Sequence, residues 1–301
     1  TFIAEAPKSH KAITKDALKE QLDIHFGKKK ETPQDFHSFF EYYIDLCDTR
    51  LNGQRSGQTI SYKGKREYAR TYYYIQEYEK DRGVHLDFED IDFDFYEDFV
   101  AYLQGLNLAT NTIGNKITFL KAVMEAAFRR ELTANVKYKS FRGLAEESDA
   151  VALSEEELQR IADYDFSDNL RLKRTRDIFI VGCWTGLRFS DITRLQAENF
   201  GERMIKITQK KTDKPVVIPI HPEVRRIWDE YNGKLPNVIS NQKFNQYIKE
   251  VCQTVGINES VLKSITRGGK KITTAYEKWQ LVSSHTARRS FATTLYRQGL
   301  S

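Results

Sequence analysis

Hydrophobic residues recur at helical spacing in the segment that follows residue 31. They stand three or four positions apart and would form one apolar helix face, made of Phe36, Phe39, Phe40, Tyr43, Ile44 and Cys47. Thr32 is placed to cap this helix, and Pro33 falls in its first turn. The pattern therefore predicts an amphipathic helix of about four turns.

The same periodicity returns three times before residue 131. Segments 62–78, 87–103 and 107–130 each carry an apolar stripe. The last segment is opened by three capping candidates, Thr110, Asn111 and Thr112. Lys116 and Lys121 are expected on its outer face. Because the loops between these segments are short, the four helices predict one small bundle over residues 32–134.

Polar segments without a strong period flank this bundle. Residues 1–31 are rich in lysine and predict a linker or a short helix. Residues 135–152 pass from Lys137 and Lys139 to the acidic Glu146 and Glu147, which is typical of a linker between domains.

A second pattern begins at residue 153 and mixes helices with short strands. Ser154–Glu157 reads as a capping box that opens a helix. The remaining elements are predicted in this order: helices at 171–184 and 188–195, a hairpin of Met204–Thr208 and Val216–Ile220, helices at 221–231 and 241–255, two possible strands around Gly268 and Gly269, and a helix at 284–297. Residues 153–301 therefore predict a mixed α/β domain.

Composition agrees with two ordered domains and limits the classes of partner. The 301 residues are 40% hydrophobic and 30% charged, with only 6 Pro, which argues against disorder. A net charge of +5 permits a polyanionic partner. The three cysteines are far apart and support neither a disulfide framework nor a zinc site. This cysteine usage indicates a reducing cytoplasm. No apolar stretch approaches the ~20 residues of a membrane span, so we expect no membrane protein.

Two short segments of the second domain carry arginines that could meet an anion. Arg188 follows Gly186 and opens the next helix, where free N–H groups favour a phosphate. Its alternative interpretation is a surface pair with Asp191. His285 and Arg288 share one helix face, and the alternative there is a solvated basic helix start capped by Ser283 or Ser284.

Lysines at the tip of the predicted hairpin are the third candidate. Lys210, Lys211 and Lys214 all lie between its two strands. The usual interpretation of such residues is a solvated turn. Lys210 and Lys211 both remain candidates for a chemical role.

Together these segments resemble the catalytic domain of the tyrosine recombinase, or phage integrase, family. That family uses an arginine in a T-G-L-R segment, a lysine in a hairpin that ends in an apolar-Pro-apolar run, and an H-x-x-R helix. Thr185–Arg188 matches the first, Lys211 with Ile218–Ile220 the second, and His285–Arg288 the third. The resemblance extends over residues 32–301, includes Asn111–Gly114, and is strongest to integrases of Bacteroidetes conjugative elements.

The resemblance implies a mainly α fold with small β-hairpins. A four-helix, SAM-like core-binding domain would occupy residues 32–134, a linker 135–152, and the tyrosine-recombinase catalytic domain 153–301. Residues 1–31 would then join a missing N-terminal domain that binds arm sites.

It also implies a site-specific recombinase of a mobile element, which cuts and rejoins DNA through a 3′-phosphotyrosine. Arg188 and Arg288 would clamp the phosphate, Lys211 would protonate the leaving oxygen, and His285 would position the phosphate or assist proton movement. Because arginine stays charged and matches phosphate geometry, neither a metal nor a cofactor is expected.

Double-stranded DNA is the implied partner, bound by two to four protomers, with accessory DNA-bending or excision factors and no membrane. The candidate DNA contacts are Lys63, Arg66, Arg70, Lys116, Lys121, Lys210, Lys214, Arg267, Lys270 and Arg289.

The sequence departs from the family pattern after the H-x-x-R helix. The second His or Trp and the tyrosine nucleophile do not follow within it, and Tyr296 is interpreted as a core or helix-surface aromatic. We therefore expect residues 1–301 to bind DNA without cleaving it. Three other functions stay open: a type IB topoisomerase-like enzyme, a non-catalytic DNA-binding regulator derived from an integrase, and a helical scaffold that binds no nucleic acid.

Overall fold

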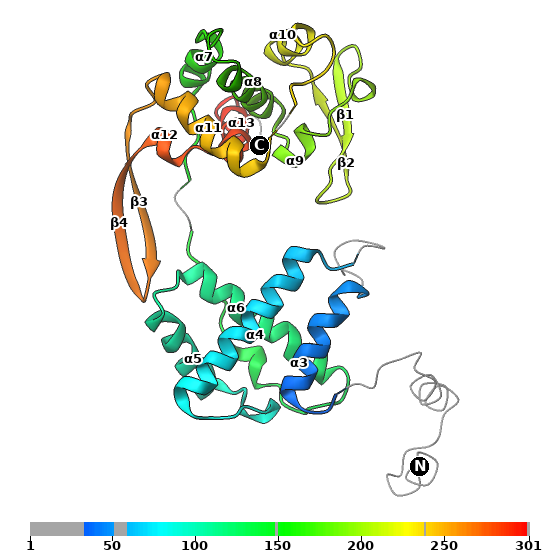
Figure 1. The fold of residues 1–301 in the computed structure, drawn as a ribbon, viewed down its shortest axis with the longest axis vertical. Coiled ribbons are helices and arrows are strands. Elements are labelled where there is room, and N and C mark those ends of the chain that lie inside the picture. The colour runs from blue at the N-terminus through cyan, green and yellow to red at the C-terminus, as the bar shows by residue number, and fades with distance from the viewer. Residues whose placement is uncertain (1–32, 51–58, 148–149, 238, 300–301) are drawn as a thin grey trace, which may run out of the picture. The chain divides into compact units, whose positions relative to one another are not determined.

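The computed structural model describes residues 33–50, 59–147, 150–237 and 239–299. The chain divides into two compact units, Thr1–Ala145 and Glu146–Ser301, and each is treated by itself (Figure 1). The predicted segment 1–31 and the predicted cap Thr32 lie outside the described residues.

Four α-helices form the described part of the first unit, as the periodicity predicted. They are α3 (Phe36–Asp45), α4 (Tyr62–Arg82), α5 (Phe93–Gly105) and α6 (Thr110–Phe128). Short 3-10 turns follow or connect them: η2 (Leu46–Asp48), η3 (Phe88–Asp90) and η4 (Lys137–Ser140). The core is strongly aromatic, and its fully buried side chains include Phe36, Phe39, Phe40 and Phe99.

The helix ends differ from the predicted ones for local reasons. The carboxylate of Asp35 accepts a hydrogen bond from the Ser38 N–H at 2.9 Å, so α3 begins at Phe36. Helix α6 has Ala109 at its N-cap, and the predicted capping by the three polar residues that follow is wrong. Helix α4 continues one turn further than predicted, to Arg82, and ends at Gly83, whose φ of 66° suits glycine.

The first half of the predicted linker belongs to the bundle. Tyr138 and Phe141 are buried in its core, and the amide of Asn135 donates to the Phe88 and Ile91 carbonyls at 2.6 and 3.0 Å. The chain at Leu144 crosses α6 at Gly114, where an added Cβ would stand 1.8 Å from the Leu144 oxygen. The linker prediction over 135–152 is therefore wrong in its first half.

The second unit is built around α8 (Leu170–Thr185), which is buried along most of its length. It is preceded by α7 (Glu155–Asp163), opened by the predicted capping box of Ser154 and Glu157. Helices α10 (Pro222–Glu230), α11 (Asn241–Thr254) and α13 (Ser284–Arg297) pack against α8. The predicted helix at 188–195 is only α9 (Phe189–Ile192), followed by η5 (Ala197–Asn199), and α12 (Lys278–Leu281) was not predicted.

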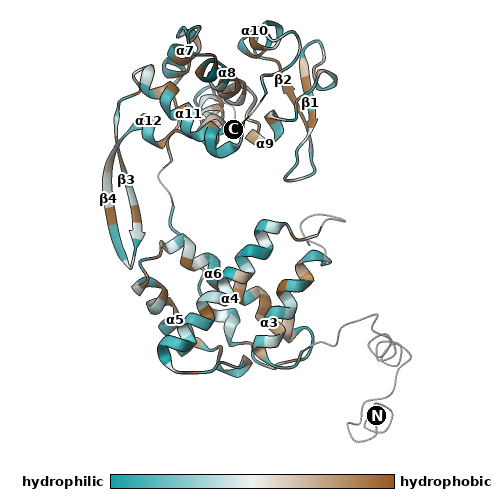
Figure 2. Cartoon of the chain, viewed as in Figure 1, coloured by the Kyte–Doolittle hydropathy of each residue, from teal (hydrophilic) through white to brown (hydrophobic). Residues whose placement is uncertain are grey.

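Both predicted hairpins are present as separate two-stranded antiparallel sheets. Strands β1 (Met204–Thr208) and β2 (Pro215–Pro219) pair with Ile205 opposite Ile218, and these two residues enter the core. Strands β3 (Ser260–Arg267) and β4 (Lys270–Glu277) extend away from the helices of their unit (Figure 1). Hydrophilic and hydrophobic segments alternate along this second hairpin (Figure 2), and β4 is exposed throughout.

Within the described residues, the longer helices are too polar to cross a membrane.

Candidate active site

Two glycines of α8 let α13 approach closely enough to bring its side chains beside those of α9. A Cβ on Gly182 would stand 3.0 Å from Ala287 Cβ, and one on Gly186 would stand 2.4 Å from Phe291 Cδ1. Gly186 also ends α8 with a φ of 62°, a conformation that other residues adopt at a cost. The T-G-L-R segment therefore needs its glycine both for the turn and for packing.

Arg188 stands directly after this turn, at the N-cap of α9, and is half-buried. Its Nη1 donates to Gln209 Oε1 at 2.9 Å, and Thr212 Oγ1 donates to the same oxygen at 2.8 Å. Gln209 thus ties the arginine to the β1–β2 connection. The predicted alternative, a surface pair of Arg188 with Asp191, is wrong because Asp191 is fully buried.

Arg288 reaches the same turn from α13. Its Nη1 donates to the Gly186 carbonyl at 2.9 Å. Burial lowers the pKa of the Arg288 guanidinium, and the nearby positive charge of Arg188 lowers it further. The two arginines therefore lie close enough to repel each other.

His285 lies one turn before Arg288 on α13. Burial lowers its pKa, and the positive charges of Arg289, Lys211, Arg188 and Arg288 add to that effect. The helix is opened by the predicted cap, because the Ser283 N–H donates to Thr286 Oγ1 at 3.0 Å in a capping box. The fold thus brings together four cationic side chains around one histidine.

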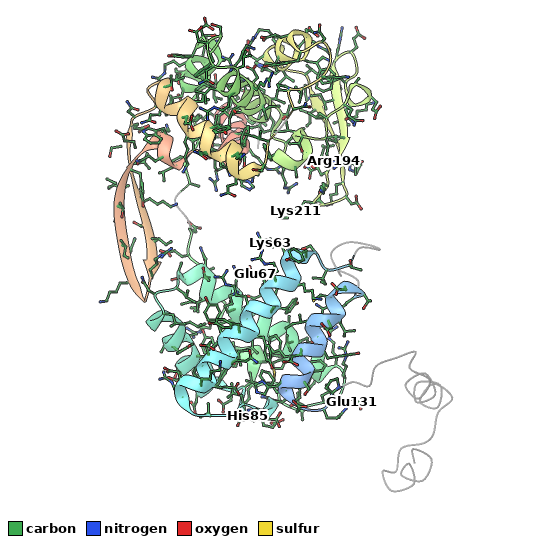
Figure 3. All side chains as sticks on the ribbon, in the orientation of Figure 1. Lys63, Glu67, His85, Glu131, Arg194 and Lys211 are labelled. Atoms are coloured by element: carbon green, nitrogen blue, oxygen red, sulfur yellow. The ribbon has the colours of Figure 1, made fainter. Side chains whose placement is uncertain are left out.

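Lys211 stands in the β1–β2 connection and is exposed, and Figure 3 shows it at the tip of that hairpin. The neighbouring Lys210 N–H donates to Asp191 Oδ1 at 2.8 Å. That bond fixes the base of the connection on α9, while Lys211 approaches His285 closely enough to lower its pKa. These contacts favour Lys211 over Lys210 as the lysine of the site.

The partners of Arg188 and Arg288 in the described part of the chain include no carboxylate. Among the residues that the structure describes, neither Arg188 nor Arg288 forms an ion pair, although both are half-buried. The buried Asp191 raises the pKa of Arg288 by its charge and lies 3.6 Å from Arg194 Nη1. Half-buried guanidiniums held together against their repulsion are suited to an oxyanion with several acceptor oxygens.

Sequence reasoning did not single out Gln209 or Asp191 as positioning residues. Gln209 is an ordinary polar residue at a strand end, and only the folded hairpin places it beside Arg188. Asp191 could have been suspected from its place one turn after Arg188, but its burial depends on the packing of α8, α9 and the hairpin.

The predicted DNA contacts of the bundle fall into two groups. Lys63, Arg66 and Arg70 are exposed on α4. The prediction that Lys116 lies outward is wrong, because the residue is 1% exposed and its ammonium donates to Glu67 Oε2 at 2.8 Å. Lys121 is half-buried, and its ammonium donates to the Lys139 and Phe141 carbonyls. It therefore holds the segment that follows α6 against the bundle.

The predicted contacts of the second unit are all exposed: Lys210, Lys214, Arg267, Lys270 and Arg289. Arg267 and Lys270 stand opposite each other at the tip of the β3–β4 hairpin. Tyr296 is 76% exposed on α13, which agrees with a helix-surface aromatic.

Two family models match the sequence. The model of the phage integrase SAM-like domain covers residues 35–143, and the model of the phage integrase family covers residues 152–301. The matched ranges coincide with the two units of the structure. No match was found among curated protein sequences.

Solved structures of similar fold include two of lambda integrase and one of XerH. A lambda integrase tetramer bound to a Holliday junction has a TM-score of 0.61 and 14% identity, over 98% of this chain and 81% of that one. A lambda integrase(75-356) dimer bound to a COC′ core site has a TM-score of 0.62 and 14% identity, over 88% and 90%. The XerH site-specific recombinase bound to palindromic difH substrate has a TM-score of 0.62 and 16% identity, over 89% and 88%.

Proposed function

The chain belongs to the phage integrase family, and from that premise we propose that it is a tyrosine-type site-specific recombinase that binds double-stranded DNA. The observation that carries the proposal is the meeting of Arg188 and Arg288 at the turn after α8, where both donate to neutral acceptors, with Lys211 and His285 beside them. A type IB topoisomerase-like enzyme is not favoured, because both family models are integrase models.

The arginines would stabilise the transition state of phosphoryl transfer. When a tyrosine oxygen attacks a phosphodiester, the phosphorus becomes five-coordinate and its non-bridging oxygens gain negative charge. Arg188 and Arg288 approach from two elements, so each can donate a pair of N–H groups to a different side of that phosphate. Gln209 and the Gly186 carbonyl hold them in place beforehand, so little reorganisation is needed during the reaction.

Lys211 would supply the proton for the leaving group. The bond to the 5′-oxygen breaks as the bond to the tyrosine oxygen forms, and the 5′-oxygen leaves as a hydroxyl if a general acid protonates it. A lysine on an exposed hairpin can reach that oxygen while the arginines hold the phosphate. Attack of a second 5′-hydroxyl on the 3′-phosphotyrosine reverses these steps and joins a new strand, so no external energy source is required.

His285 would donate to, or shuttle a proton near, the same phosphate. Since its pKa is lowered, it is neutral at neutral pH in the absence of DNA, and the negative phosphate would favour its charged form. This makes His285 the residue of the site whose protonation responds most directly to DNA.

Both units would contact the duplex through phosphates. The cations that support this are Lys63, Arg66 and Arg70 on α4, and Lys210, Lys214, Arg267, Lys270 and Arg289 on the second unit, all exposed. We propose a dimer to tetramer on DNA, since solved lambda integrase complexes of similar fold are dimers and tetramers. Accessory DNA-bending or excision factors would act on that assembled complex.

The origin and the compartment are part of the same proposal. We propose a Bacteroidetes conjugative or integrative mobile element as the source, a proposal supported by the resemblance of the T-G-L-R, hairpin and H-x-x-R segments to integrases of such elements. A bacterial cytoplasm, where the chain would meet chromosomal DNA, is the proposed compartment, and three free cysteines suit it.

Selection from a pool of randomised duplexes tests the proposed function. We expect the chain to enrich a defined sequence, with an affinity that falls by about a thousandfold or more between low and physiological salt if six or more phosphates are contacted. A helical scaffold would retain no duplex at either salt concentration. Salt-sensitive binding without any enriched sequence would contradict a site-specific recombinase and leave only general DNA binding.

A further inference from the structure

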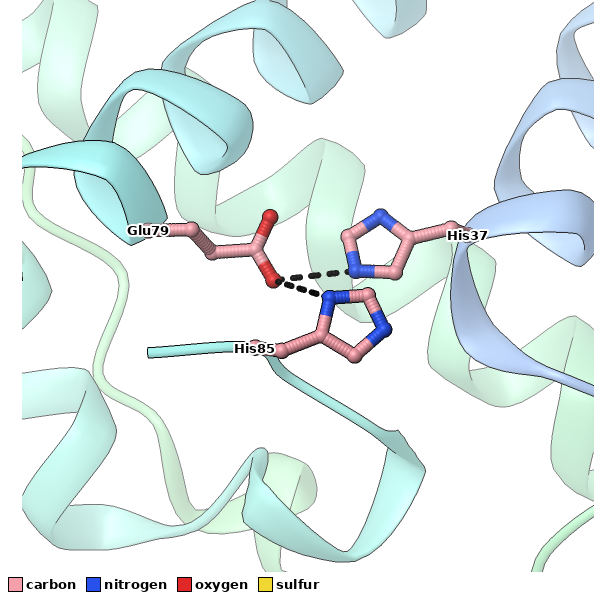
Figure 4. A group of neighbouring side chains, drawn as sticks. All are labelled: His37, Glu79 and His85. Atoms are coloured by element: carbon pink, nitrogen blue, oxygen red, sulfur yellow. Dashed lines mark hydrogen bonds and ion pairs between the residues drawn. The ribbon is translucent and has the colours of Figure 1, made fainter. Parts of the chain in front are cut away.

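Three side chains with metal-binding atoms converge at one end of the bundle. His37 comes from α3, Glu79 from the last turn of α4, and His85 from the connection after α4 (Figure 4). Glu79 Oε1 lies 2.9 Å from His37 Nε2 and 3.7 Å from His85 Nδ1. One ligand atom from each residue lies within 4.8 Å of the other two.

His37 presents its Nε2 to the Glu79 carboxylate. Its Nδ1 lies 3.2 Å from Tyr72 Oη, and Tyr72 itself donates to Glu41 Oε1 at 3.3 Å. When the tyrosine proton is directed at Glu41, Nδ1 of His37 is the donor to Tyr72 and the lone pair of Nε2 faces Glu79. In that tautomer a cation between Nε2 and Glu79 Oε1 would satisfy both atoms.

His85 presents a second nitrogen to the same carboxylate oxygen of Glu79. Its ring stacks on that of His37 at a centroid distance of 4.6 Å and an interplanar angle of 20°, and its Nδ1 faces the same Glu79 oxygen. One divalent ion bound by both nitrogens and the carboxylate would satisfy all three groups at once.

We propose that His37, Glu79 and His85 bind a divalent transition metal ion of the Zn²⁺ type. Two imidazoles and one carboxylate are an established ligand set for zinc, with metal–ligand distances of about 2.0–2.2 Å that separate tetrahedral ligands by roughly 3.4 Å. The two distances to Glu79 Oε1, 2.9 and 3.7 Å, lie on either side of that separation. Small side-chain movements would therefore complete the site.

The surroundings of the three ligands suit such an ion. Glu79 is nine-tenths buried, and its Oε1 accepts the Leu86 N–H at 2.6 Å, which orients the carboxylate. Tyr72 orients His37 in the same way. The His85 side chain is 84% exposed, so an ion can enter from solvent and a water can take the fourth position.

The proposed ion would join the start of α3 to the end of α4. Its binding free energy would add to the stability of the bundle, because the unfolded chain does not hold the three ligands together. Figure 3 shows His85 at the opposite end of the bundle from Lys63, so the ion is not expected to contact DNA bound by the exposed cations of α4. The proposal is thus independent of the recombinase function.

Titration of the purified chain with ZnCl₂ and with CoCl₂ tests the site. We expect one Zn²⁺ per chain by calorimetry, visible absorption of four- or five-coordinate Co²⁺, and a higher unfolding temperature with Zn²⁺ than with a chelator. Glu79→Gln keeps an acceptor for Leu86 but loses the charge, and His85→Ala alters only an exposed side chain. Each should weaken Zn²⁺ binding at least about tenfold, the minimum seen when even an outer-shell partner is lost.

Glu77→Gln is the matched control, because Glu77 lies two residues earlier on α4 and pairs only with the exposed Lys80 among the described residues. It should bind Zn²⁺ as the unaltered chain does. Tyr72→Phe leaves all three ligands in place but removes the hydroxyl that orients His37. It should therefore weaken Zn²⁺ binding about tenfold. If the unaltered chain binds no Zn²⁺, or if Glu79→Gln and His85→Ala bind it as well as Glu77→Gln, the site does not exist.

Discussion

At the scale of single residues, the site is defined by two arginines that form no ion pair with any of the described residues. Arg188 and Arg288 are half-buried, and within the described part of the chain they donate to neutral acceptors, the Gln209 amide and the Gly186 carbonyl. Holding these charges together lowers the free energy of unfolding of the free protein. Binding of an anion would offset that loss. Arg188 and Arg288 are therefore suited to bind a negatively charged ligand such as a scissile phosphate.

The protonation of His285 should report this ligand. Burial and positive neighbours lower its pKa, and a bound phosphate should raise it again, so DNA binding takes up a proton. We expect duplex affinity to rise as pH falls from the raised pKa of His285 in the DNA complex to its lowered pKa in the free chain, measured by fluorescence anisotropy at constant ionic strength.

His285→Ala should remove most of that pH dependence. His221→Asn serves as control, because burial also lowers the pKa of His221, which caps α10, and asparagine can replace the cap. Equal pH dependence in His285→Ala and the unaltered chain would exclude His285 as the linked group.

Lys211 can be separated from Lys210 by changing the leaving group. In the full-length natural protein, Lys211→Ala should slow cleavage of an ordinary phosphodiester by about 10²–10⁴-fold, the usual contribution of a general acid. A substrate with sulfur at the 5′-bridging position should restore the rate, because a thiolate leaves without protonation. Lys210→Ala should cleave both substrates nearly normally. Equal defects in the two variants on the ordinary substrate would remove the distinction.

At the scale of secondary-structure elements, the contact of α8 with α13 positions the site. Gly186→Ala would place a Cβ against Phe291 and force a residue with a side chain to adopt a φ of 62°. Gly256→Ala is the matched control, since Gly256 has a φ of 78° with nothing within 4 Å of the added Cβ.

The control variant should lose about 1 kcal/mol of unfolding free energy from backbone strain alone. Gly186→Ala should lose that amount plus the cost of the clash, about 1–3 kcal/mol more, by denaturant unfolding. Equal losses would show that the close approach of Phe291 to the turn is unimportant.

The β3–β4 hairpin presents two cations at its tip, and their loss should change the salt dependence of binding. The pair of substitutions Arg267→Ala and Lys270→Ala should reduce the slope of log affinity against log salt by about two, one for each phosphate contact. The pair Lys80→Ala and Arg129→Ala, at bundle residues that bind carboxylates, should leave the slope unchanged. Unchanged slopes in both pairs would place the hairpin tip away from DNA.

Elements with strong periodicity or a defined cap could be predicted from sequence, and those set by tertiary packing could not. Helix α13 and the β1–β2 hairpin have apolar patterns and turn residues that act locally, so their predicted bounds agree with the observed ones to within about one residue. Residues 135–141 lack a period because two aromatics, Tyr138 and Phe141, fill a gap in a core formed elsewhere. Lys116 was predicted to face outward because it is charged. Its side chain is instead buried, and its ammonium donates to Glu67.

At the scale of the whole molecule, the site depends on residues that are far apart in the sequence. Arg188, Lys211 and Arg288 could be proposed together only because each stands in a recognisable local motif in the family's order. Their supporting contacts could not be proposed, because Gln209 and Asp191 carry no motif of their own. The His37, Glu79 and His85 group was likewise hidden, since its spacing of 42 and 6 residues matches no usual metal-binding pattern.

Arg188, Lys211, His285 and Arg288 are expected to activate a phosphodiester and not merely to attract DNA. Single-turnover cleavage of a nicked suicide substrate, alongside equilibrium binding of the same duplex, tests this in the full-length natural protein. Arg288→Ala and Arg188→Ala should bind within about tenfold of the unaltered protein, since each loses one phosphate contact. They should form the covalent protein–DNA adduct at least about 10²-fold more slowly. Adduct formation at nearly the unaltered rate in either variant would contradict the account.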